Sequence, residues 1–117
     1  MKSASGIKRV WRAAGYSLDG FIAAFQREHA FRQELAVVVP LLLLAVGLPI
    51  PWRDTALLCA SLLLVLIVEL LNSAIETCVD YISLARHPLA KQAKDMGSLA
   101  VLLSLFVAGI IWLSVLF

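Results

Sequence analysis

The sequence is poor in charge, in cysteine and in the glycine-rich loops that bind nucleotides. Only 15% of its 117 residues are charged and 62% are hydrophobic, which is typical of a single-domain membrane protein rather than a soluble one. Cys59 and Cys78 lack the spacing of a metal site, so we interpret them as small buried residues. Neither a Walker A loop nor a protein-kinase glycine-rich loop is present. No signal peptide is expected, because an amphipathic stretch follows the basic N-terminus.

The N-terminal quarter has helical periodicity. From Ile7 to Phe25 the apolar residues recur at steps of three and four, with Lys8, Arg9 and Arg12 on other faces. This pattern predicts an amphipathic surface helix over about 5–27 that lies on an anionic membrane. An ordinary amphipathic helix packed against protein is the alternative.

Three long apolar segments follow, at 30–50, 54–84 and 90–117. Each is long enough to cross a hydrocarbon core of about 30 Å. We therefore predict an all-α membrane protein with three transmembrane helices behind the surface helix. Basic residues precede the first span and surround the connection between the second and third spans, which predicts a cytoplasmic N-terminus and a periplasmic C-terminus.

A stripe of polar residues marks the second span. Glu69, Asn72, Glu76 and Asp80 are spaced i, i+3, i+7 and i+11, so they share one helical face. Acidic side chains on an apolar helix are costly to bury and therefore indicate a functional site. A polar seam between helices is the alternative, although like charges repel in such a seam. Asp80 is interpreted as a solvated charge or a partner of Arg86, and not as catalytic.

The predicted topology brings this stripe to the membrane boundary together with acids and bases from other segments. Glu28 and Glu34 precede or begin the first span, and Lys94 opens the third. Carboxylates with basic residues at head-group level suit Mg²⁺ and phosphate, with Lys94 and Arg9 placed to neutralise phosphate oxygens. Glu69, which lies deeper, suits proton abstraction. The sequence thus predicts phosphoryl transfer to a membrane-embedded hydroxyl group.

Four ordered motifs, covering essentially the whole chain, resemble those of the small integral-membrane diacylglycerol kinases of bacteria. They are Ala13-Ala14-Gly15-Tyr16-Ser17, Glu28-x-Ala30-Phe31-Arg32-Gln33-Glu34, Glu69-x-x-Asn72-Ser73-Ala74-Ile75-Glu76-x-x-x-Asp80 and Ala93-Lys94-Asp95-Met96-Gly97-Ser98. The resemblance implies a homotrimer in the bacterial inner membrane, with composite active sites at subunit interfaces. It also implies MgATP-dependent phosphorylation of diacylglycerol to phosphatidic acid.

The resemblance further implies roles for individual residues. Glu69 is expected to be the general base, Asn72 to position the reacting groups, and Glu28 with Glu76 to hold Mg²⁺. Arg86 departs from the family pattern and is included for its charge alone. ATP is expected to contact Arg9, Tyr16, Glu28, Glu76, Arg86, His87, Lys94 and Asp95. The lipid is expected to contact Arg9, Ala13, Ala14, Ala30, Phe31, Arg32, Gln33, Glu34, Glu69, Ser98 and Trp112.

Two other functions stay open at this point. The first is the same fold acting on undecaprenol, although the Gly97-Ser98 pair and the segment 28–34 favour diacylglycerol. The second is a non-enzymatic membrane subunit or small channel in which the carboxylate stripe lines a pore. The outer halves of the spans lack charges, which argues against a conduction path.

Overall fold

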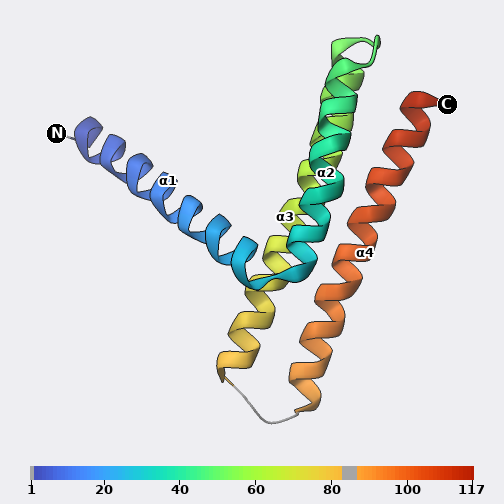
Figure 1. Ribbon diagram of the computed structural model, residues 1–117. Helices are drawn as coiled ribbons and strands as arrows, with labels where there is room; N and C mark the ends of the chain where they lie inside the picture. Colours follow the sequence, from blue (N-terminus) through green and yellow to red (C-terminus); the bar gives the residue numbers. More distant parts are fainter. Residues whose placement is uncertain (1, 83–86) are drawn as a thin grey trace.

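The computed structural model describes residues 2–82 and 87–117, and all regular secondary structure in these residues is α-helical. Its helices are α1 (Lys2–Arg27), α2 (His29–Gly47), α3 (Trp52–Ile82) and α4 (Pro88–Leu116). The last three run side by side as a bundle, whereas α1 leaves the bundle at a wide angle (Figure 1). Each bundle helix is long and apolar enough to cross a membrane, which confirms the prediction of three candidate spans.

Prolines set the ends of the first two bundle helices. α2 continues through Pro40 and ends at Gly47, because the backbone becomes extended at Leu48 and Pro49 cannot continue the helix. α3 then begins directly after Pro51. The first span is therefore shorter than the predicted 30–50, and the second begins before residue 54. The predicted end of the second span, residue 84, lies outside the described residues.

α3 is the central helix of the bundle and packs against both α2 and α4. Its buried positions recur at steps of three and four, so they form one stripe along the helix. Polar residues occupy much of this stripe, especially in its C-terminal half. The buried residues are Leu58, Ser61, Leu62, Val65, Glu69, Asn72 and Ser73.

The junction between α1 and α2 is held by an aromatic contact and a charged side chain. Phe31, which is 1% exposed, packs edge-on against Phe21 with ring centroids 5.7 Å apart. The Arg32 guanidinium donates to the carbonyl oxygens of Phe25 at 2.6 Å and Gln26 at 3.1 Å. These bonds satisfy carbonyls that the end of α1 leaves unpaired. Both contacts fix where α1 leaves the bundle.

Both cysteines are free, but they are not both buried. Cys59 is half-buried and Cys78 is exposed. The prediction of a small buried residue is therefore wrong for Cys78. The reason is positional, because this residue lies off the buried stripe that faces α2 and α4.

Candidate active site

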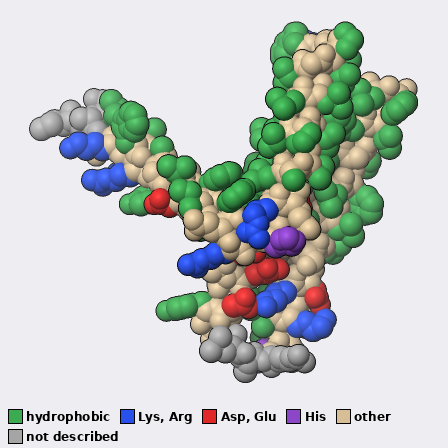
Figure 2. Space-filling view, in the orientation of Figure 1, with side chains coloured by type: hydrophobic (Ala, Val, Ile, Leu, Met, Phe, Trp, Pro, Cys, Tyr) green, Lys and Arg blue, Asp and Glu red, His purple; other side chains and the backbone are tan. Residues whose placement is uncertain are grey.

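Charged side chains gather at the end of the bundle where α1 joins α2, while hydrophobic side chains cover most of the remaining length of the spans (Figure 2). Four carboxylates lie there. Glu28 lies at the junction of α1 and α2, Glu34 lies on α2, and Glu69 and Glu76 lie on α3. The carboxylate of Glu69 is within electrostatic reach of the other three. The fold thus brings together acids that are far apart in the sequence.

The deepest members of this cluster are almost fully enclosed. Glu69 is 5% exposed and Asn72 is 9% exposed, both on the buried stripe of α3. Within the described part of the chain, Asn72 Oδ1 is buried without a hydrogen-bond partner, and the only partner of the buried Glu34 carboxyl group is the carboxyl group of Glu69. A buried polar atom left unpaired costs about 1–3 kcal/mol, so native proteins rarely keep one without a function. Orphaned oxygen atoms of this kind are typical of a ligand-binding site.

Asn72 lies against the backbone of α4 at Gly97. A β-carbon at position 97 would overlap Asn72 Oδ1 and lie 3.0 Å from its Cγ. Only glycine therefore allows α4 to approach this amide so closely. The motif that contains Gly97 favoured diacylglycerol as the substrate, but it did not predict the contact of Gly97 with Asn72. An isolated glycine inside an apolar helix is the signal that indicates such a close approach.

Two ion pairs lie beside the carboxylates. Lys94 Nζ is 2.7 Å from Asp80 Oδ1, which joins α4 to α3, and Lys91 Nζ is 2.7 Å from Asp95 Oδ2 within α4. Lys94 is also within electrostatic reach of Glu76. Exposed pairs of this kind contribute little to stability, so a phosphate can displace the carboxylate at small cost. The alternative partner of Asp80, Arg86, lies outside the described residues.

His87 has a clear structural role at the start of α4. Its Nδ1 accepts a hydrogen bond of 3.1 Å from the backbone N–H of Leu89, and Pro88 occupies the first helical position. Both features are typical of a helix N-terminus. His87 therefore fixes where α4 begins, a few residues before Lys94.

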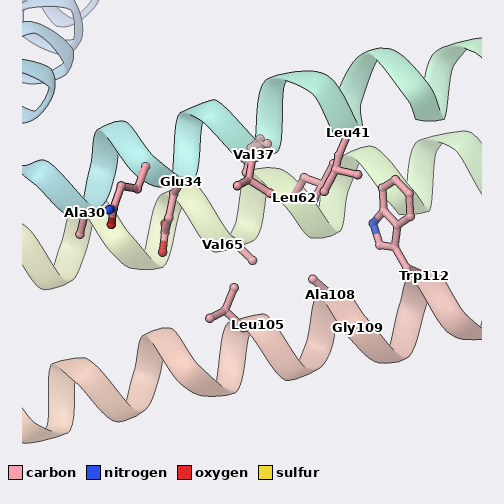
Figure 3. A pocket seen from close by; sticks show the side chains of 12 residues that line it. Ala30, Glu34, Val37, Leu41, Leu62, Val65, Leu105, Ala108, Gly109 and Trp112 are labelled. Carbon is pink, nitrogen blue, oxygen red and sulfur yellow. The ribbon is translucent and has the colours of Figure 1, made fainter.

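A groove runs along α2, α3 and α4 away from the carboxylates and has a volume of about 540 Å³. Glu34 lies near one end and Trp112 near the other (Figure 3). Its walls are almost wholly apolar. The lining residues are Ala30, Gln33, Glu34, Val37, Val38, Leu41, Leu62, Val65, Leu105, Ala108, Gly109 and Trp112.

Apart from Glu69, the residues of the bundle helices that were predicted to contact lipid divide into three groups. Four of them line the groove: Ala30, Gln33, Glu34 and Trp112. Phe31 and Arg32 instead anchor α1 to α2. A further residue, Ser98, is exposed on α4 and does not line the groove.

The predicted site residues on α1 are not brought to the carboxylates within one chain. Arg9, Ala13, Ala14 and Tyr16 are exposed, and they lie along the part of α1 that extends away from the bundle (Figure 1). Their assignment to a shared site therefore requires α1 of another subunit.

The carboxylates fit a magnesium ion that is shared with phosphate. Considering only residues 2–82 and 87–117, no three His, Cys, Asp or Glu side chains are grouped to hold a metal ion by themselves. Mg²⁺, however, is usually held by one or two carboxylates together with water and substrate phosphates. Glu28 makes no side-chain capping bond to α2, so its carboxylate is available as a ligand. Glu76 supplies a second carboxylate near Lys94.

The fold and site define a membrane protein that collects acids and bases at one end of a three-span bundle. The prokaryotic diacylglycerol kinase family matches residues 15–116. A diacylglycerol kinase of Pseudomonas aeruginosa is 51% identical over 98% of this chain and 94% of its own. The corresponding protein of Escherichia coli K12 is 47% identical over 92% and 88%, and that of Haemophilus influenzae is 40% identical over 100% and 99%.

The chain therefore belongs to the prokaryotic diacylglycerol kinase family. It is a bacterial membrane protein and a kinase. Membership of a kinase family also argues against the channel and the non-enzymatic subunit that the sequence left open.

Proposed function

We propose that the protein transfers the γ-phosphoryl group of ATP to the free hydroxyl group of diacylglycerol, which yields phosphatidic acid and ADP. The observation that carries this proposal is the convergence of Glu28, Glu34, Glu69 and Glu76 at one end of the spans. Relatives 40–51% identical to this chain are named diacylglycerol kinase. At such an end a lipid alcohol can stay in the membrane and a nucleotide can stay in water while the two react.

Glu69 is the general base of the proposed reaction. It is buried on α3 beside Asn72, where it accepts the proton of the lipid hydroxyl as the hydroxyl oxygen attacks the γ-phosphorus. The bond between that phosphorus and the bridging oxygen of ADP breaks in the same step. Asn72, packed against Gly97, positions the reacting groups.

Glu28 and Glu76 are the proposed ligands of Mg²⁺. When bound with ATP, the ion neutralises charge on the phosphate oxygens. Lys94, close to Glu76, exchanges its exposed contact with Asp80 for a phosphate oxygen. The remaining proposed nucleotide contacts are Arg9, Tyr16, Arg86, His87 and Asp95.

The lipid lies in the groove with its glycerol near Ala30, Gln33 and Glu34. These residues lie at the same end of the bundle as the carboxylates, and an acyl chain would follow the apolar walls towards Trp112 (Figure 3). The clusters of basic residues at this end favour the cytoplasmic side of the inner membrane, with the C-terminus periplasmic.

α1 is proposed to lie on the anionic membrane surface and to complete the site of a neighbouring subunit in a homotrimer. Its basic residues and its exposed Trp11 and Phe25 suit an interfacial helix. Mixing a Tyr16→Ala variant with a Glu69→Gln variant should restore part of the lost activity, because some sites then receive both intact side chains. Activity no higher than that of either variant alone would argue that each chain forms its own site.

The proposed reaction is tested by following radiolabelled phosphate from ATP into lipid in mixed micelles. Diacylglycerol and undecaprenol are supplied side by side at equal mole fraction. We expect labelled phosphatidic acid as the dominant product. Faster formation of undecaprenyl phosphate would transfer the assignment to the polyprenol, and the absence of both products would contradict a lipid kinase.

A further inference from the structure

Glu28, one of the two proposed ligands of Mg²⁺, is the single residue that separates α1 from α2. α1 ends at Arg27 and α2 begins at His29, and the backbone of Glu28 between them is extended, with φ −105° and ψ 102°. Its amide N–H donates to the carbonyl oxygen of Ala24 at 2.8 Å, and its own carbonyl oxygen accepts from the amide of Arg32 at 3.2 Å. Glu28 is thus bonded to both helices, and the angle between them decides where its carboxylate lies.

The side chain of Arg32 reaches back across this junction to the last turn of α1. Its Nη1 donates to the carbonyl oxygen of Phe25 at 2.6 Å and to that of Gln26 at 3.1 Å. A charged donor makes a stronger bond than a neutral one, and a cation is favoured at the C-terminal end of a helix. One side chain of α2 therefore ties down the backbone on the α1 side of Glu28.

These bonds leave the carboxylate of Glu28 without a cation. The ion pairs between described residues, Lys91–Asp95 and Lys94–Asp80, include neither Arg32 nor Glu28. The charge of Arg32 is used on backbone carbonyls instead. Glu28 is within electrostatic reach of Glu69, so an anionic side chain is held near the other acids and remains free to bind a divalent ion.

We propose that Arg32 is a positioning residue for Mg²⁺ binding, because it holds the junction at which Glu28 is placed to share the ion with Glu76. This inference rests on the proposed role of Glu28 as a metal ligand. Residues that orient a metal ligand typically change the metal affinity about 10- to 100-fold when they are lost. The resemblance implied a lipid contact for Arg32, and the two roles predict different results.

The experiment compares Mg²⁺ titrations of purified full-length variants in mixed micelles. Arg32→Gln should raise the Mg²⁺ concentration for half-maximal rate about fivefold to tenfold, while KM for diacylglycerol stays at its wild-type value. Arg32→Lys keeps the charge and the N–H donors and should recover most of this loss. Phe21→Leu weakens the aromatic contact with Phe31 at the same junction and should raise the half-maximal concentration about twofold. Phe21→Leu leaves Arg32 intact, so the test does not depend on the stability of Arg32→Gln.

Arg27→Gln is the matched control for Arg32→Gln. Arg27 is the exposed last residue of α1 and is adjacent to Glu28 in the chain, so this variant removes one positive charge from the same junction. Its Mg²⁺ titration should stay within about twofold of wild type. In a double-mutant cycle, Arg32→Gln should cause no further shift once Glu28→Gln is present.

Limited proteolysis gives a second measurement that does not depend on turnover. Trypsin cleaves after Arg27, and mass spectrometry identifies the product. Cleavage there should be about fivefold faster in Arg32→Gln, because a junction that has lost its tie opens more often. Mg²⁺ with a non-hydrolysable ATP analogue should slow the cleavage, and half of this protection should require about fivefold to tenfold more Mg²⁺ in Arg32→Gln than in wild type.

A higher KM for diacylglycerol with an unchanged Mg²⁺ titration in Arg32→Gln would overturn this inference and assign Arg32 to the lipid. Equal shifts in Arg32→Gln and Arg27→Gln would reduce the effect to a loss of charge, which also overturns it. Additive shifts in the double mutant would show that Arg32 does not act through Glu28. An unchanged titration in Glu28→Gln would instead contradict the metal site of the proposed function, and the inference with it.

Discussion

The two ends of the bundle differ in how their buried polar groups are hydrogen-bonded. At the end where α1 joins α2, Asn72 Oδ1 is buried without a partner among the described residues, and the Glu34 carboxyl group has only the carboxyl group of Glu69 as its partner. Towards the other end, the hydroxyls of Ser61 and Ser104 each bond to a carbonyl of their own helix, and Trp112 bonds to Ser61.

This difference distinguishes polar residues that bind a ligand from polar residues that only stabilise the helices. A hydroxyl that returns its bond to its own helix adds little to packing between helices and needs no ligand. Burying an unpaired oxygen atom next to the carboxylates around Glu69 costs free energy. Proteins retain such atoms where a ligand supplies the missing hydrogen-bond partner. Substitutions at the end with the carboxylates should therefore change turnover or Mg²⁺ dependence, whereas matched substitutions at the opposite end should leave both close to wild type.

The largest effect is expected for Glu69→Gln. Removing the general base should lower kcat by about 10² to 10⁴ while preserving the shape of the side chain. Asp54→Asn is the matched control, since Asp54 lies on the same helix at the opposite end. Initial rates of labelled phosphatidic acid formation measure both variants.

The Asp54 variant should remain close to wild type, and size-exclusion profiles should be unchanged for both. Wild-type turnover in Glu69→Gln would falsify the assignment of the base. A similar loss in both variants would mean that the two ends do not differ in function.

The next largest effect is expected for the metal dependence. Glu28→Gln and Glu76→Gln should each raise the Mg²⁺ concentration for half-maximal rate by about tenfold or more, because one anionic ligand is lost. Asp19→Asn, a change at an exposed position on α1, should leave the titration unchanged. A titration curve identical to that of wild type would remove either glutamate from the metal site.

A smaller effect is expected for Gly97→Ala. The added β-carbon overlaps the Asn72 amide, and overpacking of this kind typically costs about 1–3 kcal/mol. We expect kcat to fall about tenfold as Asn72 is displaced, with the oligomer retained. The decisive measurement is a double-mutant cycle of kcat with Asn72→Ala, in which Gly97→Ala should have no further effect.

Gly47→Ala is the control for Gly97→Ala, since a β-carbon at position 47 meets nothing within 4 Å. Its kcat should equal that of wild type. Additive losses in the double mutant would show that Gly97 does not act through Asn72.

The smallest effect is expected for Lys94→Met, which should raise KM for ATP a few-fold without abolishing turnover. The charge of Lys94 is exposed and therefore screened by salt. Arg53→Met removes a cation at the opposite end, where the guanidinium lies over the Trp52 ring. Its KM should not change, and an equal rise in both variants would indicate a general effect of net charge.

The sequence was sufficient to predict three spans and the polar stripe of α3. Both predictions depend on local sequence patterns, namely the length of an apolar run and the spacing of Glu69, Asn72 and Glu76 along one helix. The similar depth of Glu34 and Glu69 also followed from the predicted topology, but their direct contact did not. The catalytic roles of these residues remain predictions.

Contacts between distant residues could not be predicted. Ser61 resembles any small residue in an apolar run, and its partner Trp112 is remote in the sequence. The contacts by which Phe31 and Arg32 hold α1 in place were not predicted, and their proposed contact with lipid remains a prediction. The direction of α1 depends on such side-chain contacts, which periodicity alone does not reveal.

The bond between Trp112 and Ser61 also gives the protein an internal optical reporter. Trp11 and Trp52 are both 74% exposed and can be replaced by phenylalanine, which leaves one indole. That indole lines the groove, where a brominated acyl chain would quench its fluorescence on contact. The fluorescence intensity would then report the occupancy of the groove in real time, without any turnover.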